Sequence, residues 1–246
     1  MQSKTYKHPV LLSILLALIP IVCMSAAGTA IAITEADGEK ATIIQTIAVA
    51  LSAIIGVFLV KAIKCTYSDV GFCTLKSGSA RAALFYIPMI AVELVQIVTT
   101  PIGALNVQSV IIFFIFTLLV GLNEELYFRG LILRVLGQIG IPKAIIISSV
   151  IFGAGHAATA LSGASLQYVI LQIIFAFLFG FVAAEAVVIT GSLLPLIAWH
   201  FIHDFWGYLA GGIGDTVDGT AMVVLVIQIV ILIITAILYW RKIVKQ

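Results

Sequence analysis

The chain holds a small set of ionisable residues inside long stretches that are otherwise almost entirely apolar. They are Glu93, Glu124, Glu125, Arg129, His156, Glu185, His200, His203 and Asp204. At the centre of a membrane-spanning helix, a charged side chain costs about 2.5–3.5 kcal/mol on insertion scales, so such groups normally face a protein interior or a water-filled cavity. These residues are therefore the first candidates for a chemical function.

The first group is the motif E-E-x-x-x-R, formed by Glu124, Glu125 and Arg129. Residues four apart share one face of a helix, so Glu125 and Arg129 can form an ion pair, whereas Glu124 points about 100° away. We expect the pair to fix the helix and Glu124 to face a cavity, with Phe128 below it. The alternative is that all three charged residues simply mark the cytoplasmic end of a helix.

Two further motifs place histidines at helical spacing. In F-x-x-x-H, Phe152 and His156 lie on one face of a helix, and in H-x-x-x-D, His200 and Asp204 can address one point. A histidine in an apolar helix is also often a hydrogen-bonded packing residue. His203 could reach the same cavity as His200 or none, and a structural role is the simpler interpretation of it.

A glutamate together with histidines can activate water. The carboxylate takes a proton from the water, and the imidazoles hold that water, bind a metal or stabilise the oxyanion that forms when water adds to a carbonyl. Three polar motifs in three helices indicate one buried site, and the reaction class is hydrolysis, most simply of a peptide bond. Glu93 and Glu185 lie outside the motifs and either line a substrate path or pair with a polar group of a neighbouring helix.

A non-catalytic membrane protein is the competing interpretation. It would be a transporter-like bundle with buried carboxylates, or a scaffold or immunity partner. Transporters also place ionisable residues at mid-depth, but they usually show repeated halves. The sequence shows no such repeat, and its full set of glutamate and histidines favours catalysis.

The elements that position these residues are predicted to be transmembrane helices. Of the 246 residues, 62% are apolar and 10% are charged, and the mean hydropathy is +1.23. A soluble chain of this length needs a polar surface, so the composition indicates an all-α, polytopic membrane helical bundle. We expect residues 1–246 to form a single integral membrane domain.

About eight stretches are long enough to cross a bilayer core, which takes roughly 20 helical residues. They cover residues 9–32, 42–63, 81–99, 107–138, 143–161, 166–189, 192–211 and 220–240. The fourth stretch is longer than one span needs. We expect its C-terminal part to leave the membrane or to lie at its surface.

The basic residues indicate the orientation, because short loops rich in lysine and arginine stay cytoplasmic. One side would carry Lys4, Lys7, Lys61, Lys64, Lys76, Arg81, Arg129, Arg134, Lys143, Arg241, Lys242 and Lys245. The opposite loops would carry Lys40 with Glu35, Asp37, Glu39, Asp215 and Asp218. Both termini are therefore expected in the cytoplasm. The basic residues follow the topology and form no cluster, so we expect no nucleic acid partner.

The three motifs resemble those of the CPBP family, the CAAX-protease and bacteriocin-processing (Abi) intramembrane proteases. They stand in the family's order, and the similar core covers residues 114–208. The resemblance implies a helical bundle whose conical cavity opens to the cytoplasmic side. It implies that Glu124 and His156 activate the water and that His200 and Asp204 line the oxyanion side. Supporting roles then fall to Glu125, Arg129 and Phe152.

The resemblance leaves two options for a cofactor, one Zn²⁺ or no metal. The helical zinc signature H-E-x-x-H is absent from the sequence. The candidate ligands are His156 and His200 with Glu124 or Asp204, which come from three helices. Many family members have asparagine where Asp204 stands. An ionised aspartate cannot donate a hydrogen bond to an oxyanion, so Asp204 is expected to be protonated, to orient His200 or to ligate a metal.

The substrate implied by the resemblance is a membrane protein or lipidated peptide within the bilayer, of CAAX type or related to bacteriocins. Short loops and compact length point to the plasma membrane of a prokaryote. The substrate's sequence and its cleavage site do not follow from these residues.

Overall fold

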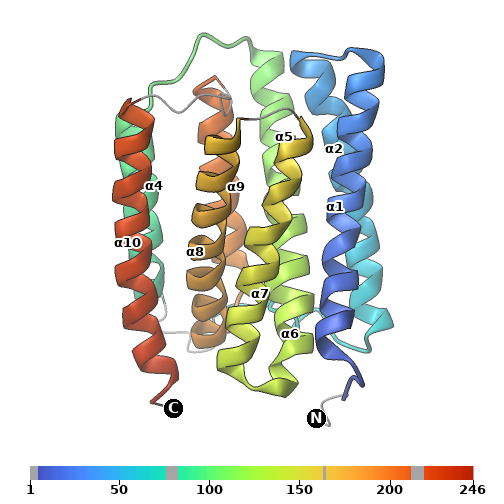
Figure 1. Cartoon of the computed structure of the whole chain (residues 1–246), viewed down its shortest axis with the longest axis vertical. Coiled ribbons are helices and arrows are strands. Elements are labelled where there is room, and N and C mark those ends of the chain that lie inside the picture. Colours follow the sequence, from blue (N-terminus) through green and yellow to red (C-terminus); the bar gives the residue numbers. More distant parts are fainter. Residues whose placement is uncertain (1–4, 76–82, 163–164, 212–218, 246) are drawn as a thin grey trace.

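The computed structural model describes residues 5–75, 83–162, 165–211 and 219–245, and all regular structure in these ranges is helical. The helices run up and down in one bundle, with the two chain ends on the same side of it (Figure 1). This arrangement confirms the predicted all-α, polytopic fold.

The helices follow the predicted stretches closely. Their bounds are α1 Pro9–Thr34, α2 Gly38–Ala62, η1 Leu84–Tyr86, α4 Ile87–Thr99, α5 Val107–Glu125, α7 Ile141–Gly155, α8 Leu166–Thr190, α9 Leu194–Leu209 and α10 Gly219–Ile243. The predicted start of the third stretch, at residues 81–82, lies outside the described residues. Side chains of Asn106 and Ser165 cap α5 and α8 by accepting a backbone N–H, as is usual for a helix N-terminus.

Two names are used below for the ends of the bundle. The terminal end carries both chain termini and consists of residues 5–8, 63–75, 137–140, 191–193 and 244–245. The distal end lies opposite and consists of residues 35–37, 100–106 and 210–211. Because α8 and α10 begin at the distal end while α9 begins at the terminal end, their residues can be ordered by depth along the bundle.

The outer surface is apolar, as expected for a protein that sits in lipid. In the described ranges, 6 helices are long and apolar enough to span a membrane, and the continuous segment Val107–Ile139 is one of them. The Leu84–Thr99 segment and α9 are shorter. Large apolar side chains face outward, such as Val98, 81% exposed, and Ile33, 77% exposed. Such a surface is typical of an integral membrane protein.

The long fourth helix changes its helical geometry along its length. After α5 the chain continues as a π-helical segment (η2, Leu126–Ile132), then α6 (Leu133–Leu136) and η3 (Gly137–Ile139). Every residue of η2 is buried, so this part packs inside the bundle. The expectation that the C-terminal part of the stretch leaves the membrane or lies at its surface stays a prediction. Single π turns interrupt helices mostly at functional sites, and this one directly follows Glu125.

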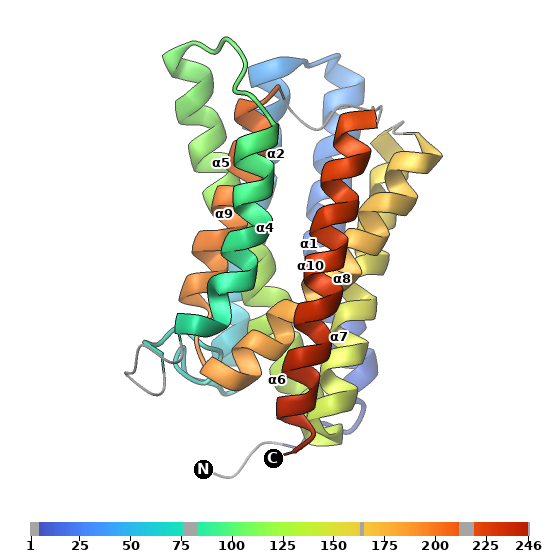
Figure 2. The ribbon, with the colours of Figure 1, turned by 90° about the vertical axis from the view of Figure 1, so that its left-hand side faces the viewer.

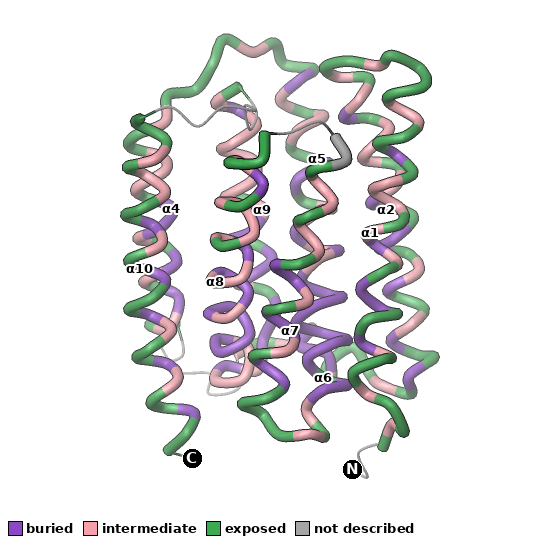
Figure 3. The backbone as a smooth tube through the Cα atoms, viewed as in Figure 1, coloured by how far each residue is buried: buried purple, intermediate pink, exposed green. Residues whose placement is uncertain are grey.

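Packing between α5 and α9 brings the motif residues together. A Cβ atom at Gly121 would lie 3.1 Å from Phe201 N and 3.2 Å from Ile197 O, so only glycine allows this close approach of the two backbones. On the other side α7 packs on α8, while α4 and α10 lie together along one face of the bundle (Figure 2). Buried residues gather in the half nearer the terminal end (Figure 3).

Candidate active site

The ion pair predicted from the E-E-x-x-x-R motif is present. Arg129 Nη1 lies 3.1 Å from Glu125 Oε1, and both side chains are almost completely buried. The Arg129 guanidinium also lies 4.0 Å from the centre of the Phe152 ring, a cation–π contact. Gly180 leaves room for it, because a Cβ atom there would lie 3.2 Å from Arg129 Nη2. Phe152 of the second motif thus supports the arginine of the first.

Glu125 also holds His200, a contact that the sequence motifs do not predict. His200 Nδ1 lies 2.8 Å from the same Glu125 Oε1 that binds Arg129. Since a carboxylate oxygen accepts, Nδ1 carries the hydrogen, and Nε2 is the nitrogen left for chemistry. That Nε2 lies 3.8 Å from Glu124 Oε2 and 3.6 Å from Asp204 Oδ2. Four of the predicted site residues therefore meet around one imidazole.

The two adjacent glutamates are in different environments. Glu125 is fully buried and is used by two donors, whereas the Glu124 side chain is 25% exposed. Glu124 makes no hydrogen bond within the described residues. Its carboxylate is therefore available to water, and Glu125 is not.

His156 sits where α7 ends. Its Nδ1 lies 2.8 Å from the carbonyl oxygen of Phe152, which can only accept, so His156 also keeps Nε2 for other partners. Its ring packs edge-on against Phe152, with ring centres 4.7 Å apart. The F-x-x-x-H motif therefore acts as a local unit in which Phe152 positions the histidine.

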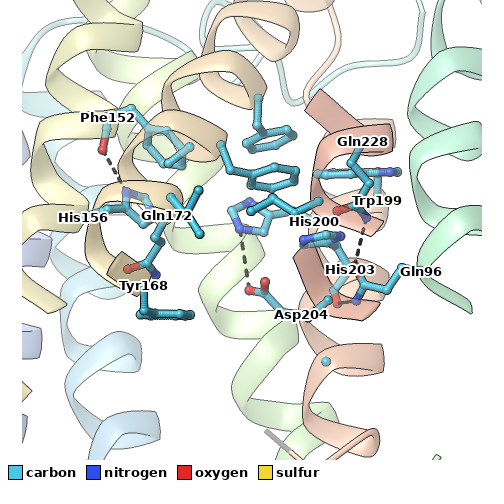
Figure 4. A pocket seen from close by; sticks show the side chains of 17 residues that line it. Gln96, Phe152, His156, Tyr168, Gln172, Trp199, His200, His203, Asp204 and Gln228 are labelled. Atoms are coloured by element: carbon cyan, nitrogen blue, oxygen red, sulfur yellow. Dashed lines mark hydrogen bonds and ion pairs between the residues drawn. The ribbon is translucent and has the colours of Figure 1, made fainter. Parts of the chain in front are cut away.

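A cavity of about 310 Å³ lies between α4, α7, α8, α9 and α10. Figure 4 shows His156 on one side of it, His203 on the other and His200 between them. The wall also includes Asp204, but not Glu124, which was expected to face a cavity. Glu124 lies beside the cavity, next to the lining residue His200. Four uncharged polar side chains complete the polar part of the wall: Gln96, Tyr168, Gln172 and Gln228.

The residues of the cavity wall are more deeply buried toward the terminal end. Phe179, Trp199 and His200 are at most 7% exposed and form its deep part. Tyr168 and Ala221, at the distal starts of α8 and α10, are more exposed.

Glu93 and Glu185, the two buried glutamates outside the motifs, differ from each other in their surroundings. Glu93 Oε2 lies 3.1 Å from His203 Nδ1, so the histidine treated as ambiguous is on the cavity wall and is held by a buried carboxylate. Glu185 is fully buried, and neither of its oxygens has a hydrogen bond partner within the described residues. Neither arrangement has a local sequence signal, because each depends on how distant helices pack.

The candidate metal ligands do not fit a zinc site in this arrangement. Within the described residues, no three His, Cys, Asp or Glu side chains are placed to share a metal ion, whereas a tetrahedral zinc site needs at least three protein ligands. His156 lies on one side of the cavity, and His200 lies between it and His203 (Figure 4).

The family model described as type II CAAX prenyl endopeptidase Rce1-like matches residues 106–206. The matched region contains all three motifs, and it confirms the resemblance to the CAAX-protease family. No curated protein and no solved structure matches the chain.

Proposed function

We propose that this chain is an intramembrane endopeptidase that hydrolyses a peptide bond with water activated by Glu124. The difference between the two adjacent glutamates is the observation that carries the proposal. Glu125 is committed to Arg129 and His200, and Glu124 keeps a partly exposed carboxylate within 3.8 Å of His200 Nε2. A base beside a held imidazole is the arrangement that water activation needs.

In the proposed reaction, Glu124 takes a proton from water as the water oxygen attacks the scissile carbonyl carbon. The carbonyl oxygen becomes an oxyanion, which accepts a hydrogen bond from Nε2–H of protonated His200. Glu124 then gives its proton to the amide nitrogen, and the carbon–nitrogen bond breaks. The products are a carboxylic acid and an amine.

His156 and Asp204 are assigned to positioning. His156 Nε2 faces the same cavity as His200 and is free to hold the attacking water or the substrate carbonyl. Asp204 Oδ2 lies 3.6 Å from His200 Nε2, too far for a hydrogen bond but close enough for an electrostatic interaction with the ring. Of the three roles expected for Asp204, orienting His200 is the one that this contact supports.

The proposed substrate is a membrane protein or lipidated peptide, of the CAAX type that the family description names or related to bacteriocins. We place the enzyme in a prokaryotic plasma membrane with both termini in the cytoplasm. The described basic residues support that orientation, since short basic loops stay cytoplasmic. Those at the terminal end, or within three residues of it along a helix, are Lys7, Lys61, Lys64, Arg134, Lys143, Arg241, Lys242 and Lys245.

The Glu124→Gln variant tests the function, because an amide cannot accept the proton of water. Membrane peptides from cells with the wild-type chain and with Glu124→Gln are compared by mass spectrometry. We expect cleavage products to disappear in the variant, with a loss of rate of about 10²–10⁴-fold for a purified pair.

Glu185→Gln is the matched control, since it makes the same change at a buried glutamate outside the cavity wall. It should leave the cleavage products in place. Normal processing by a well-expressed Glu124→Gln protein would remove the protease assignment and favour a scaffold or transporter.

A further inference from the structure

His203 lies on the wall of the candidate site but belongs to none of the three motifs. It stands three residues after His200 on α9, and both residues line the cavity, with His156 on the other side of His200 (Figure 4). The side chain of His203 is 19% exposed. A polar side chain that is partly exposed on the wall of a cavity can contact whatever the cavity binds.

The orientation of the His203 ring is fixed from several directions. Its Nδ1 lies 3.1 Å from Oε2 of the buried Glu93. The ring stacks on Trp199 and on Phe175, with interplanar angles of 15° and 13°. The backbone is held as well, because the carbonyl oxygen of His203 accepts from Gln96 Nε2 at 2.9 Å. A ring that is already held in place loses little freedom when it binds a ligand.

The remaining nitrogen of His203 is a hydrogen bond acceptor in the neutral ring. Because the Glu93 carboxylate accepts, Nδ1 carries the hydrogen and Nε2 keeps its lone pair. Nε2 makes no hydrogen bond within the described residues. In the proposed reaction His200 donates to the substrate from its own Nε2, whereas His203 can accept from it.

A second unpaired acceptor lies on the described part of the wall. Gln172 Oε1 is buried and has no hydrogen bond partner among the described residues. The amide nitrogens of Gln96 and Gln228 each donate within the protein, to the carbonyl oxygens of His203 and Val92. Lysine and arginine are absent from the described wall. Since a buried acceptor without a partner is costly, the group that binds here is expected to donate hydrogen bonds.

We propose that His203, held by Glu93, is a specificity-determining residue that selects a substrate side chain able to donate a hydrogen bond. This inference rests on the proposed proteolytic function and adds a rule for the substrate. The selected side chain carries a hydroxyl or carboxamide group and lies near the scissile bond, because His200 and His203 are about one helical turn apart. An ionised carboxylate in its place cannot donate to Nε2. It would also lie near the carboxyl groups of Glu93 and Asp204, and like charges repel.

Capture of synthetic peptides by the detergent-solubilised full chain tests the proposal without catalysis. The protein carries Glu124→Gln, so that bound peptides are not cut. The probes are short apolar peptides in which each position in turn is asparagine, aspartate, serine or alanine. Asparagine and aspartate have nearly the same shape but differ in the ability to donate a hydrogen bond. Mass spectrometry measures how strongly each peptide is enriched.

At one position, we expect the asparagine and serine peptides to be enriched over the aspartate peptide by about tenfold, which corresponds to about 1.4 kcal/mol. Adding His203→Phe together with Glu93→Gln should bring this ratio close to unity, because the stacked ring is kept and Nε2 is lost. Glu93→Gln alone is the matched control. Its amide oxygen still accepts from His203 Nδ1, so most of the preference should remain.

Three results overturn the proposal. They are equal capture of all peptides at every position, a preference for the aspartate peptide, and a preference for asparagine that survives His203→Phe. If the protein with His203→Phe does not fold, His203→Gln tests the same point. The glutamine amide can donate to a carboxylate, so this variant should admit the aspartate peptide.

The role of His203 and the protease assignment can fail separately. If wild-type cells yield no cleavage products that depend on Glu124, while capture keeps the preference that depends on His203, the protease assignment is removed and His203 remains a binding residue. If Glu124-dependent products appear but capture shows no such preference, only the role of His203 is removed.

Discussion

Helix α9 carries two histidines, each held at Nδ1 by a buried glutamate from another helix, yet their surroundings differ. The Glu125–His200 contact is 2.8 Å long and the Glu93–His203 contact 3.1 Å. Glu125 Oε1 is also bound by Arg129, whereas no second partner of Glu93 is found among the described residues. The other oxygen of each glutamate has no hydrogen bond partner there. The first pair is part of a charged network, and the second is not.

The free nitrogens of the two imidazoles differ as well. His200 Nε2 has the carboxyl groups of Glu124 and Asp204 within 4 Å. The His203 ring instead stacks on Trp199, with ring centres 5.0 Å apart, and on Phe175, at 5.4 Å. Both imidazoles are held by a carboxylate, so the surroundings of Nε2 are what distinguish them. The difference suggests that His200 takes part in the reaction and that His203 positions substrate on the cavity wall.

The largest expected effect comes from breaking the network around Glu125. Arg129→Leu leaves a buried carboxylate without its cation, which costs about 3–5 kcal/mol of stability. Glu93→Gln should cost only about 1 kcal/mol, because the amide oxygen can still accept from His203 Nδ1. Denaturant unfolding of the detergent-solubilised proteins measures both values.

The double variant Glu125→Gln with Arg129→Leu provides the control for that comparison. Removing both charges together should recover part of the lost stability, since no buried charge is then left alone. An Arg129→Leu protein of normal stability but without activity would show that Arg129 acts in the chemistry and not as a structural cation.

The next effect distinguishes the two histidines by kinetics. His200→Ala removes the proposed oxyanion donor and should lower kcat by about 10²–10³-fold with little change in KM. His203→Ala removes a wall contact and should mainly raise KM, by about fivefold, the equivalent of one hydrogen bond of about 1 kcal/mol. Steady-state kinetics on a peptide identified from the Glu124 comparison provides both constants. If His203→Ala lowers kcat as strongly as His200→Ala, the two pairs have the same role.

Contacts between residues close in sequence were predictable in this site, and contacts between residues distant in sequence were not. Glu125 and Arg129 are four residues apart, so helical geometry alone predicts their pairing. The contact between Glu125 and His200 joins positions 75 residues apart, and it depends on the α5–α9 approach at Gly121. Apolar length predicted the helices well, because lipid requires long apolar helices.

The π-helical segment and the contact between Glu93 and His203 could not be predicted from the sequence either. The residues Leu126–Ile132 have the apolar character of an ordinary helix, and nothing in their composition favours i→i+5 hydrogen bonds. Glu93 and His203 lie 110 residues apart and belong to no motif.

The smallest expected effect comes from removing the charge of Asp204, which makes the surroundings of His200 more like those of His203. Asp204 supplies a carboxyl group near His200 Nε2 that His203 lacks, and Asp204→Asn removes its charge while keeping an oxygen that can accept. If Asp204 only orients His200, kcat/KM should change by no more than about fivefold, the equivalent of about 1 kcal/mol.

The purified protein should also contain far less than one metal ion per chain, and chelators should leave its activity unchanged. Elemental analysis and kinetics of wild-type and Asp204→Asn protein measure these quantities together. A stoichiometric metal ion in the wild-type protein that is lost with activity in Asp204→Asn would identify Asp204 as a metal ligand. That result would mean that His200 and Asp204 come together around a metal in the active state, and the contrast with His203 would then be one of metal binding.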